Sequence, residues 1–176
     1  MTNAAFDLGE EIKLHTLEFK LHVGLWNKFS KTGKLDLSIS NWKSIKYLNT
    51  TATALHDDVA SIPNRVGGLY LFTIKCDILP GITEFPVYIG RAQKTETQNL
   101  RKRCKEYFQK FAKTNERPLV TKMFKYWDKN IFLYYLPLAT NHDIINDEKD
   151  LINSLLLPFN TEIPDAETKQ ATLAFP

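Results

Sequence analysis

Glu148 is the residue whose position in the sequence most strongly suggests chemistry. It lies on a helix predicted over residues 143–157. The apolar stripe of that helix has i, i+3, i+4 spacing and comprises Ile144, Ile145, Leu151, Ile152, Leu155 and Leu156. A carboxylate in the middle of such a stripe is unfavourable unless it is paired or bound to a cation. The pattern therefore indicates a cation ligand, a pair with a buried Arg, or a partly exposed Glu that the dipole near the helix start favours.

A second set of capable side chains lies on a helix predicted over residues 99–113. Arg101 and Arg103 flank its apolar face on opposite edges, and Arg103 lies one turn before Tyr107. An Arg beside a core face and next to a Tyr can clamp an oxyanion or a phosphate. It is equally often a surface residue with a buried stem, and helix geometry does not choose between the two arginines.

Tyr70 and Tyr88 lie in two neighbouring predicted strands, 68–75 and 86–90. Taken singly, such tyrosines are more often packing residues whose hydroxyl has found a partner. Whether they belong to a functional site depends on which residues the other elements place beside them.

Several other kinds of site are excluded by the sequence. It contains no HExxH, CxxC, nucleophile-elbow, P-loop or Rossmann motif, and Cys76 and Cys104 are too few for a Cys-rich zinc site. No apolar run approaches about 18 residues, so no transmembrane span and no membrane partner are expected. The N-terminus lacks the apolar core of a secretory signal, so we expect a cytoplasmic protein.

Positive charge is concentrated in one segment, although the net charge is only +3. Residues 91–129 hold 12 Lys and Arg against 4 Asp and Glu, while residues 130–176 are acidic. This segment is either a solvated basic helix face or a surface for phosphates, because clustered Lys and Arg supply the sequence-independent part of nucleic-acid affinity.

These residues must be positioned by six elements that follow a glycine pair, Gly67-Gly68. Periodicity predicts strands at 68–75, 86–90 and 131–136 and helices at 99–113, 119–128 and 143–157. The order favours an α/β (α+β) domain with a small, mostly antiparallel three-stranded sheet flanked by helices.

The rest of the chain is expected to contribute fewer functional residues than residues 67–160. Residues 1–66 form a largely helical N-terminal extension, and residues 161–176 form a solvated C-terminal tail whose Asp165 and Glu167 could touch a partner. Within the extension, the sequence predicts a helix over 9–29, a short strand over 35–39 and a short helix over 50–61.

Taken together, residues 67–160 resemble the GIY-YIG nuclease family. Gly68-Leu69-Tyr70 is similar to the first signature and Tyr88-Ile89-Gly90 matches the second. Arg91 stands where many members have Lys, and Arg103 followed by Tyr107 has the register of the family's catalytic Arg helix. Glu148 with Asn160 twelve residues later resembles the family's Glu helix and its following Asn. The loops 75–86 and 92–99 are longer than usual.

The resemblance implies a role for each matched residue. Glu148 would be the metal ligand for Mg²⁺ (or Mn²⁺), Tyr70 the general base and Tyr88 a residue that positions water or phosphate. Arg91 would stabilise a tyrosinate, and Arg103 would clamp the scissile phosphate. Tyr107 would bind the phosphate or support Tyr70, and Asn160 would fix the site geometry. The phosphate backbone of DNA would contact Arg91, Lys94, Arg101, Lys102, Lys105 and Lys110.

The implied function is a divalent-metal-dependent endonuclease that hydrolyses DNA phosphodiester bonds, of the small restriction or defence type. Residues 1–66 would supply target recognition or a dimer contact, so a homodimer is possible. The alternatives are a catalytically silent nucleic-acid-binding module, or a nuclease of this family that acts on RNA or on branched or modified DNA.

Overall fold

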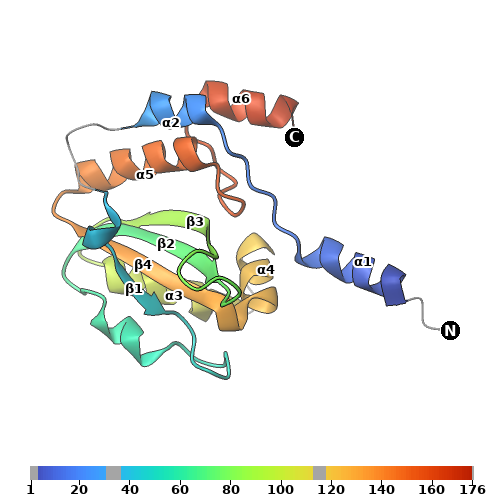
Figure 1. The fold of residues 1–176 in the computed structure, drawn as a ribbon. Helices are drawn as coiled ribbons and strands as arrows, with labels where there is room; N and C mark the ends of the chain where they lie inside the picture. The colour runs from blue at the N-terminus through green and yellow to red at the C-terminus, as the bar shows by residue number, and fades with distance from the viewer. Residues whose placement is uncertain (1–3, 31–36, 113–117, 176) are drawn as a thin grey trace.

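The computed structural model describes residues 4–30, 37–112 and 118–175, which form a mixed α/β fold (Figure 1). The described helices are α1 (Ala4–His15), α2 (Val23–Phe29), α3 (Leu100–Ala112), α4 (Pro118–Tyr126), α5 (Asn141–Leu155) and α6 (Ala166–Ala174). The described strands are β1 (Lys43–Lys46), β2 (Gly67–Lys75), β3 (Glu84–Ala92) and β4 (Ile131–Leu138). Short 3₁₀ turns occupy Ile39–Asn41, Asp57–Ser61 and Asp128–Asn130.

The strands form one antiparallel sheet in the order β1-β4-β2-β3. Across the β2–β3 pair, Tyr70 lies opposite Gly90 and Phe72 lies opposite Tyr88. Because side chains two positions apart share a face, Tyr70 and Tyr88 are diagonal neighbours on the same face. The two strands that carry the signature residues are thus paired directly.

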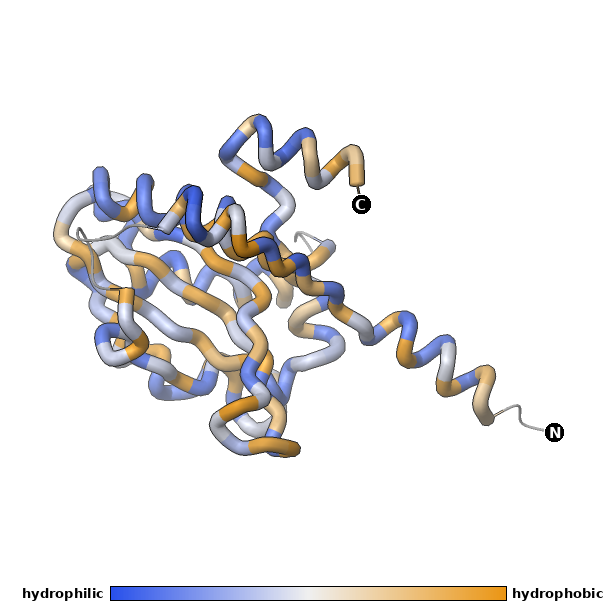
Figure 2. Tube along the Cα trace, turned by 45° about the horizontal axis from the view of Figure 1, so that its top comes forward, coloured by the Kyte–Doolittle hydropathy of each residue, from blue (hydrophilic) through white to orange (hydrophobic). Residues whose placement is uncertain are grey.

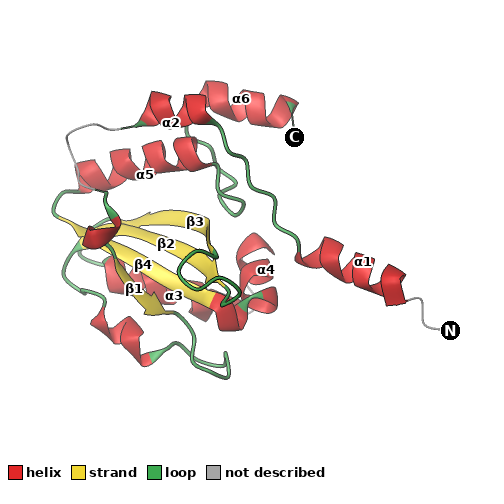
Figure 3. Ribbon diagram, viewed as in Figure 1, coloured by secondary structure: helices red, strands yellow, loops and turns green. Residues whose placement is uncertain are grey.

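Helices cover both faces of the sheet (Figure 3). On one face, Tyr70, Phe72 and Ile74 of β2 pack in a cluster with buried residues of α3 and α4. On the other face, Leu69 packs against Ile144 of α5. Helix α2 lies over α5, on the side away from the sheet (Figure 1). This layering places α3 and α5 on opposite sides of the signature strands.

The helices and strands predicted over residues 67–160 are confirmed to within a few residues. Residue 113, the predicted end of the helix at 99–113, lies outside the described residues. Helix α5 begins after Thr140, whose hydroxyl accepts from the amide of Asp143 at 3.1 Å, and ends before Leu156 in the left-handed conformation.

The three-stranded sheet was wrong, since β1 adds a fourth strand beside β4. This strand has four residues, and Ile45 is its one apolar member. So short a segment shows no recognisable alternation, and its place is set by pairing with β4 and by burial of Ile45 in the core.

The single helix predicted over residues 9–29 was also wrong, because α1 and α2 are separate. Leu17, Phe19 and Leu21 alternate with polar residues, a period of two that is typical of extended chain. The ring of His22 then begins a new helix by accepting from the amide of Leu25 at 3.1 Å.

Two smaller elements of the extension also differ from the prediction. The helix predicted over 50–61 is mostly a turn, because Asn49 accepts hydrogen bonds from the amides of Thr53 and Ala54 and competes with helix formation. Of the strand predicted over 35–39, residues 35 and 36 lie outside the described residues, and residues 37–39 form no strand.

The C-terminal tail forms α6 in place of an irregular solvated end. Asp165 begins the helix by accepting from the amide of Thr168 at 2.9 Å. Lys28 of α2 pairs with Asp165 and Glu167 at 3.3 and 2.9 Å, so these carboxylates contact the same chain. In the described part of the chain, no helix is both long and apolar enough to cross a membrane.

Candidate active site

An open cleft of about 1070 Å³ lies beside the signature strands. Six of the residues that the sequence singled out contribute to its wall: Tyr70, Tyr88, Arg91, Arg103, Glu148 and Asn160. They come from β2, β3, α3, α5 and the loop after α5. Side chains separated by up to 90 positions therefore surround one solvent-accessible space.

The position of β3 at the edge of the sheet explains how both faces reach the same cleft. Tyr88 points to the face covered by α3, whereas Arg91 lies opposite Leu69 and belongs to the face covered by α5. Because β3 is an outer strand, side chains from its two faces can meet around its free edge. The site thus joins the two layers of helices.

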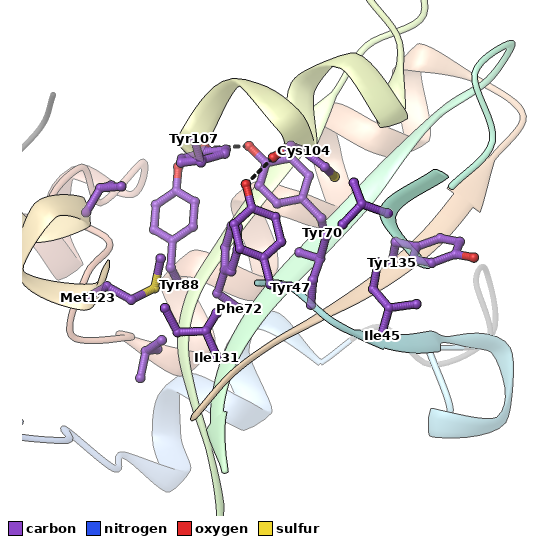
Figure 4. Packing of buried hydrophobic residues seen from close by; sticks show 14 of the residues in the cluster. Ile45, Tyr47, Tyr70, Phe72, Tyr88, Cys104, Tyr107, Met123, Ile131 and Tyr135 are labelled. Carbon is purple, nitrogen blue, oxygen red and sulfur yellow. Dashed lines mark hydrogen bonds between the residues drawn. The ribbon is translucent and has the colours of Figure 1, made fainter. Parts of the chain in front are cut away.

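Three tyrosine hydroxyls form a continuous hydrogen-bonded chain under α3 (Figure 4). The Tyr107 hydroxyl lies 2.7 Å from that of Tyr70 and 2.9 Å from that of Tyr88. Tyr107 is not among the described residues of the cleft wall, so it contacts the two tyrosines from behind. This placement favours the supporting role over direct phosphate contact.

The absence of a side chain at Gly90 makes room for the ring of Tyr70. A Cβ at Gly90 would lie 2.6 Å from Cζ of the Tyr70 ring, closer than real Cβ contacts come. The glycine of the second signature therefore has a packing reason, which is the close approach of the Tyr70 ring to the backbone of β3.

Burial favours the protonated form of the Tyr70 and Tyr107 hydroxyls. It raises the pKa of Tyr70 well above its usual range, the neighbouring Tyr107 and Tyr88 raise it further, and the charge of Arg103 acts in the opposite sense. Burial raises the pKa of Tyr107 in the same way, again against Arg103. The cation that contacts the tyrosines is thus Arg103, where the sequence reasoning had expected Arg91.

The structure distinguishes the two arginines of α3. Arg103 donates from Nε to the Tyr70 hydroxyl at 3.4 Å and lines the cleft. Arg101 donates to the carbonyl of Ile62 and is not among the described residues of the cleft wall. The pKa of Arg103 is raised, although burial acts to lower it, because Tyr70, Tyr107 and Glu106 favour the charged form.

Arg91 and Glu148 form an ion pair across the edge of the sheet. The Glu148 side chain is 14% exposed and that of Arg91 is 33% exposed. Burial raises the pKa of Glu148 above its ordinary value, and Arg91 and Arg103 only partly oppose this shift. Of the three possibilities raised for Glu148, the structure shows the pair with an Arg, and the carboxylate also faces the cleft, where it could bind a cation.

Asn160 holds the segment after α5 against β3. Its side chain accepts from the amide of Ile89 at 2.9 Å and donates to the carbonyl of the same residue at 2.8 Å. Beside it, the Phe159 amide donates to the carbonyl of Val87 at 3.0 Å. These bonds satisfy part of the free edge of β3 and fix one wall of the cleft.

Of the six residues predicted to contact nucleic acid, Arg91 alone belongs to the described cleft wall. Lys94, Lys102 and Lys110 are exposed, and Lys105 and Arg101 are half-buried. Lys102 donates to the carbonyl of Thr97 at 2.6 Å. These five side chains lie outside the described cleft wall.

Sequence reasoning missed several polar residues, including Gln93, Thr95, Thr161 and Glu162 of the cleft wall. Gln98, Lys149 and Lys169 line the cleft, and Glu106 contacts Arg103 from behind. The contact of Glu106 with Arg103 could have been predicted, since Glu106 stands three residues after Arg103 on the same helix. The positions of the others could not, because they depend on how the loops, α5 and α6 close around the cleft.

The donor set fits a magnesium-like ion. Glu148 and the exposed Glu162 line the cleft, and the described residues contain no group of three or more His, Cys, Asp or Glu able to hold a metal. Mg²⁺ commonly uses one or two protein carboxylates, substrate phosphates and several waters, so a single Glu is sufficient. A zinc site needs more protein ligands than are present here.

No family model, curated protein or solved structure matches this chain. The resemblance to the GIY-YIG nucleases therefore depends on the residues quoted above and on their arrangement.

Proposed function

We propose that this chain is an endonuclease of the GIY-YIG type that hydrolyses DNA phosphodiester bonds with a divalent metal ion. The observation that carries the proposal is the gathering of Tyr70, Tyr88, Arg91, Arg103, Glu148 and Asn160 around one open cleft. Several of these side chains are partners of one another, Arg91 with Glu148 and Arg103 with Tyr70, and all six reach the same solvent-accessible space.

Arg103 is the residue that would bind the scissile phosphate. Its guanidinium pairs with Glu106 at 3.0 Å, contacts the Tyr70 hydroxyl at 3.4 Å and lies over the ring of Tyr107, 5.5 Å from the ring centre. A fixed, always charged donor can stabilise the negative charge that develops on phosphate oxygens in the transition state.

Tyr70 would accept the proton of the attacking water. Its raised pKa makes a free tyrosinate unfavourable near neutral pH. As Tyr70 takes the proton of the water, it would pass its own proton to Tyr107, Tyr107 would pass its proton to Tyr88, and Tyr88, which lines the cleft, would release one proton to solvent. Tyr88, at the other end of the chain of hydroxyls, would position the water or the phosphate.

Glu148 would hold the Mg²⁺ or Mn²⁺ ion, and Asn160 would keep the cleft wall in place through its bonds to Ile89. When bound, such an ion supplies Lewis-acid stabilisation of phosphate charge. Arg91 pairs with Glu148 and opposes the rise in its pKa that burial causes, which favours the ionised carboxylate. The type of nuclease proposed is a restriction or defence enzyme, with residues 1–66 supplying target recognition or a contact in a homodimer.

The test is incubation of the purified protein with supercoiled plasmid DNA in Mg²⁺, Mn²⁺ or EDTA. We expect nicked or linear DNA in either metal and none in EDTA. Competition with duplex DNA, single-stranded DNA and RNA identifies the substrate class, and duplex DNA should compete best. Absence of cleavage in both metals contradicts the proposal and favours the binding-module alternative.

A further inference from the structure

Glu106 is a carboxylate that the proposed mechanism does not use. Its side chain is 23% exposed, and it is not among the described residues of the cleft wall. Both of its oxygens accept hydrogen bonds: Oε2 from Nη1 of Arg103 at 3.0 Å, and Oε1 from Nε2 of Gln98 at 2.8 Å. Its influence on the cleft therefore passes through the two side chains that it contacts there, Arg103 and Gln98.

Gln98 is itself held by the loop between β3 and α3. Its amide donates to the hydroxyl of Thr95 at 3.0 Å, and its carbonyl accepts from the amide of the same residue at 3.0 Å. The side-chain oxygen accepts from the amide of Asn99 at 3.0 Å. This loop is longer than the family resemblance leads one to expect, and Gln98 near its end contacts Glu106.

These contacts fix the guanidinium of Arg103 at several points. Nη1 is held by Glu106, Nε contacts the Tyr70 hydroxyl at 3.4 Å, and the planar group lies over the Tyr107 ring. The bond to Tyr70 is long and weak, so it does not orient Arg103 by itself. The charged pair with Glu106 is the stronger restraint.

The charges are consistent with a permanent ion pair. The pKa of Glu106 is lowered, although burial acts to raise it, because Gln98 and Arg103 both donate to the carboxylate. Gln98 leaves the carboxylate no freedom to turn away, since a rotated group would lose one of its two donors.

We infer that Glu106, held in place by Gln98, is a positioning residue that orients Arg103 toward the substrate phosphate. The inference rests on the proposed function and adds to it a role for the loop at 92–99. The loop does not need to contact the substrate to influence cleavage, because Gln98 connects it to Arg103 through Glu106.

The test is a double-mutant cycle with Glu106→Ala and Arg103→Ala in metal-dependent cleavage of a fluorescein-labelled DNA duplex. Glu106→Ala should lower kcat about tenfold to a hundredfold, because a misplaced catalytic group loses alignment. KM should change by less than about twofold, since the effect falls on the transition state. In the Arg103→Ala background, Glu106→Ala should have almost no further effect.

Gln109→Ala is the matched control, because Gln109 is an exposed residue of α3 that does not line the cleft. It should cleave like the wild type. Glu106→Asp should recover part of the lost kcat, which a simple loss of helix stability would not predict.

Two results would overturn the inference while leaving the proposed function intact. The first is a wild-type kcat in Glu106→Ala, and the second is a full additional loss when Glu106→Ala is combined with Arg103→Ala. If the wild type cleaves no duplex, the proposed function fails, and a crystal structure of Glu106→Ala then decides about positioning alone. Arg103 displaced from Tyr70 supports the inference, and Arg103 unmoved contradicts it.

Discussion

The edge of the sheet around β3 and the arm formed by α1 differ in what holds them. Around β3, Tyr70, Tyr88 and Tyr107 are buried, and their polar atoms are bonded to one another. In α1, none of the twelve described residues is buried, and Phe6 and Ile12 are 61% and 57% exposed. The helix projects away from the rest of the molecule (Figure 1 and Figure 2). Its other large apolar residues, Leu8 and Leu14, are exposed as well.

This difference shows where sequence changes should matter. A residue near β3 contacts several others, so a small change there displaces the neighbouring side chains of the site. A residue of α1 has few contacts within the described chain, so a similar change there has little effect on the fold. The predictions below use matched substitutions to test that contrast.

The largest effect is expected for the arginines of α3. Arg103→Ala should lower kcat about 10²–10³-fold, because a fixed donor to the developing phosphate charge is lost. Arg101→Ala, the matched control on the opposite edge of the helix, should leave kcat within about threefold of the wild type. The measurement is the initial rate of plasmid cleavage in Mg²⁺. Equal losses in the two variants would contradict the assignment of Arg103.

Matched glycine substitutions compare the two regions directly. Gly90→Ala should destabilise the protein by about 1–3 kcal/mol, because its Cβ forces Tyr70 to move. Gly9→Ala should be neutral or slightly stabilising, since nothing lies within 4 Å of the new Cβ and Ala favours a helix. Urea unfolding followed by circular dichroism gives both values. The contrast fails if Gly90→Ala is as stable as the wild type.

Alkaline pH should act on the buried tyrosines. Burial raises the pKa of Tyr47, Tyr70 and Tyr107 above the value in the unfolded chain. Their contribution to folding stability is therefore fully present below about pH 10 and is lost as the pH rises through the folded-state pKa. Ultraviolet absorbance should show these tyrosinates forming together with unfolding. Their ionisation in the folded protein would contradict the predicted burial.

The smallest effect is expected where α2 meets α6. Lys28 pairs with Asp165 and Glu167 on the surface, where solvent and salt screen the charges. Lys28→Ala should leave both the unfolding midpoint and the cleavage rate close to wild type. A large loss of either would show that the contact between α2 and α6 supports the cleft more strongly than its exposure suggests.

Sequence patterns predicted the elements that carry the site but not all of their contacts. Strands 68–75 and 131–136 and helix 143–157 have strong periodicity over enough residues to be recognised. Residues 43–46 do not, because four residues with one apolar member show no periodicity, and pairing with β4 sets their place in the sheet.

The individual site residues show the same limit. The inward position of Glu148 could be read from its helix, because helical spacing alone determines which residues share a face. The choice of Arg103 over Arg101 came from the family resemblance, since both flank the apolar stripe equally. The contact between Gln98 and Glu106 depends on a loop conformation, which no periodic pattern encodes.

The central claim is tested most directly by removing the carboxylate of Glu148. The measurement is metal-dependent plasmid cleavage by Glu148→Ala beside the wild type and Asp150→Asn, a matched change on the same helix at a residue that does not line the cleft. The account predicts that Glu148→Ala folds and binds DNA but does not cleave, while Asp150→Asn cleaves like the wild type. Retained cleavage by folded Glu148→Ala would contradict the account.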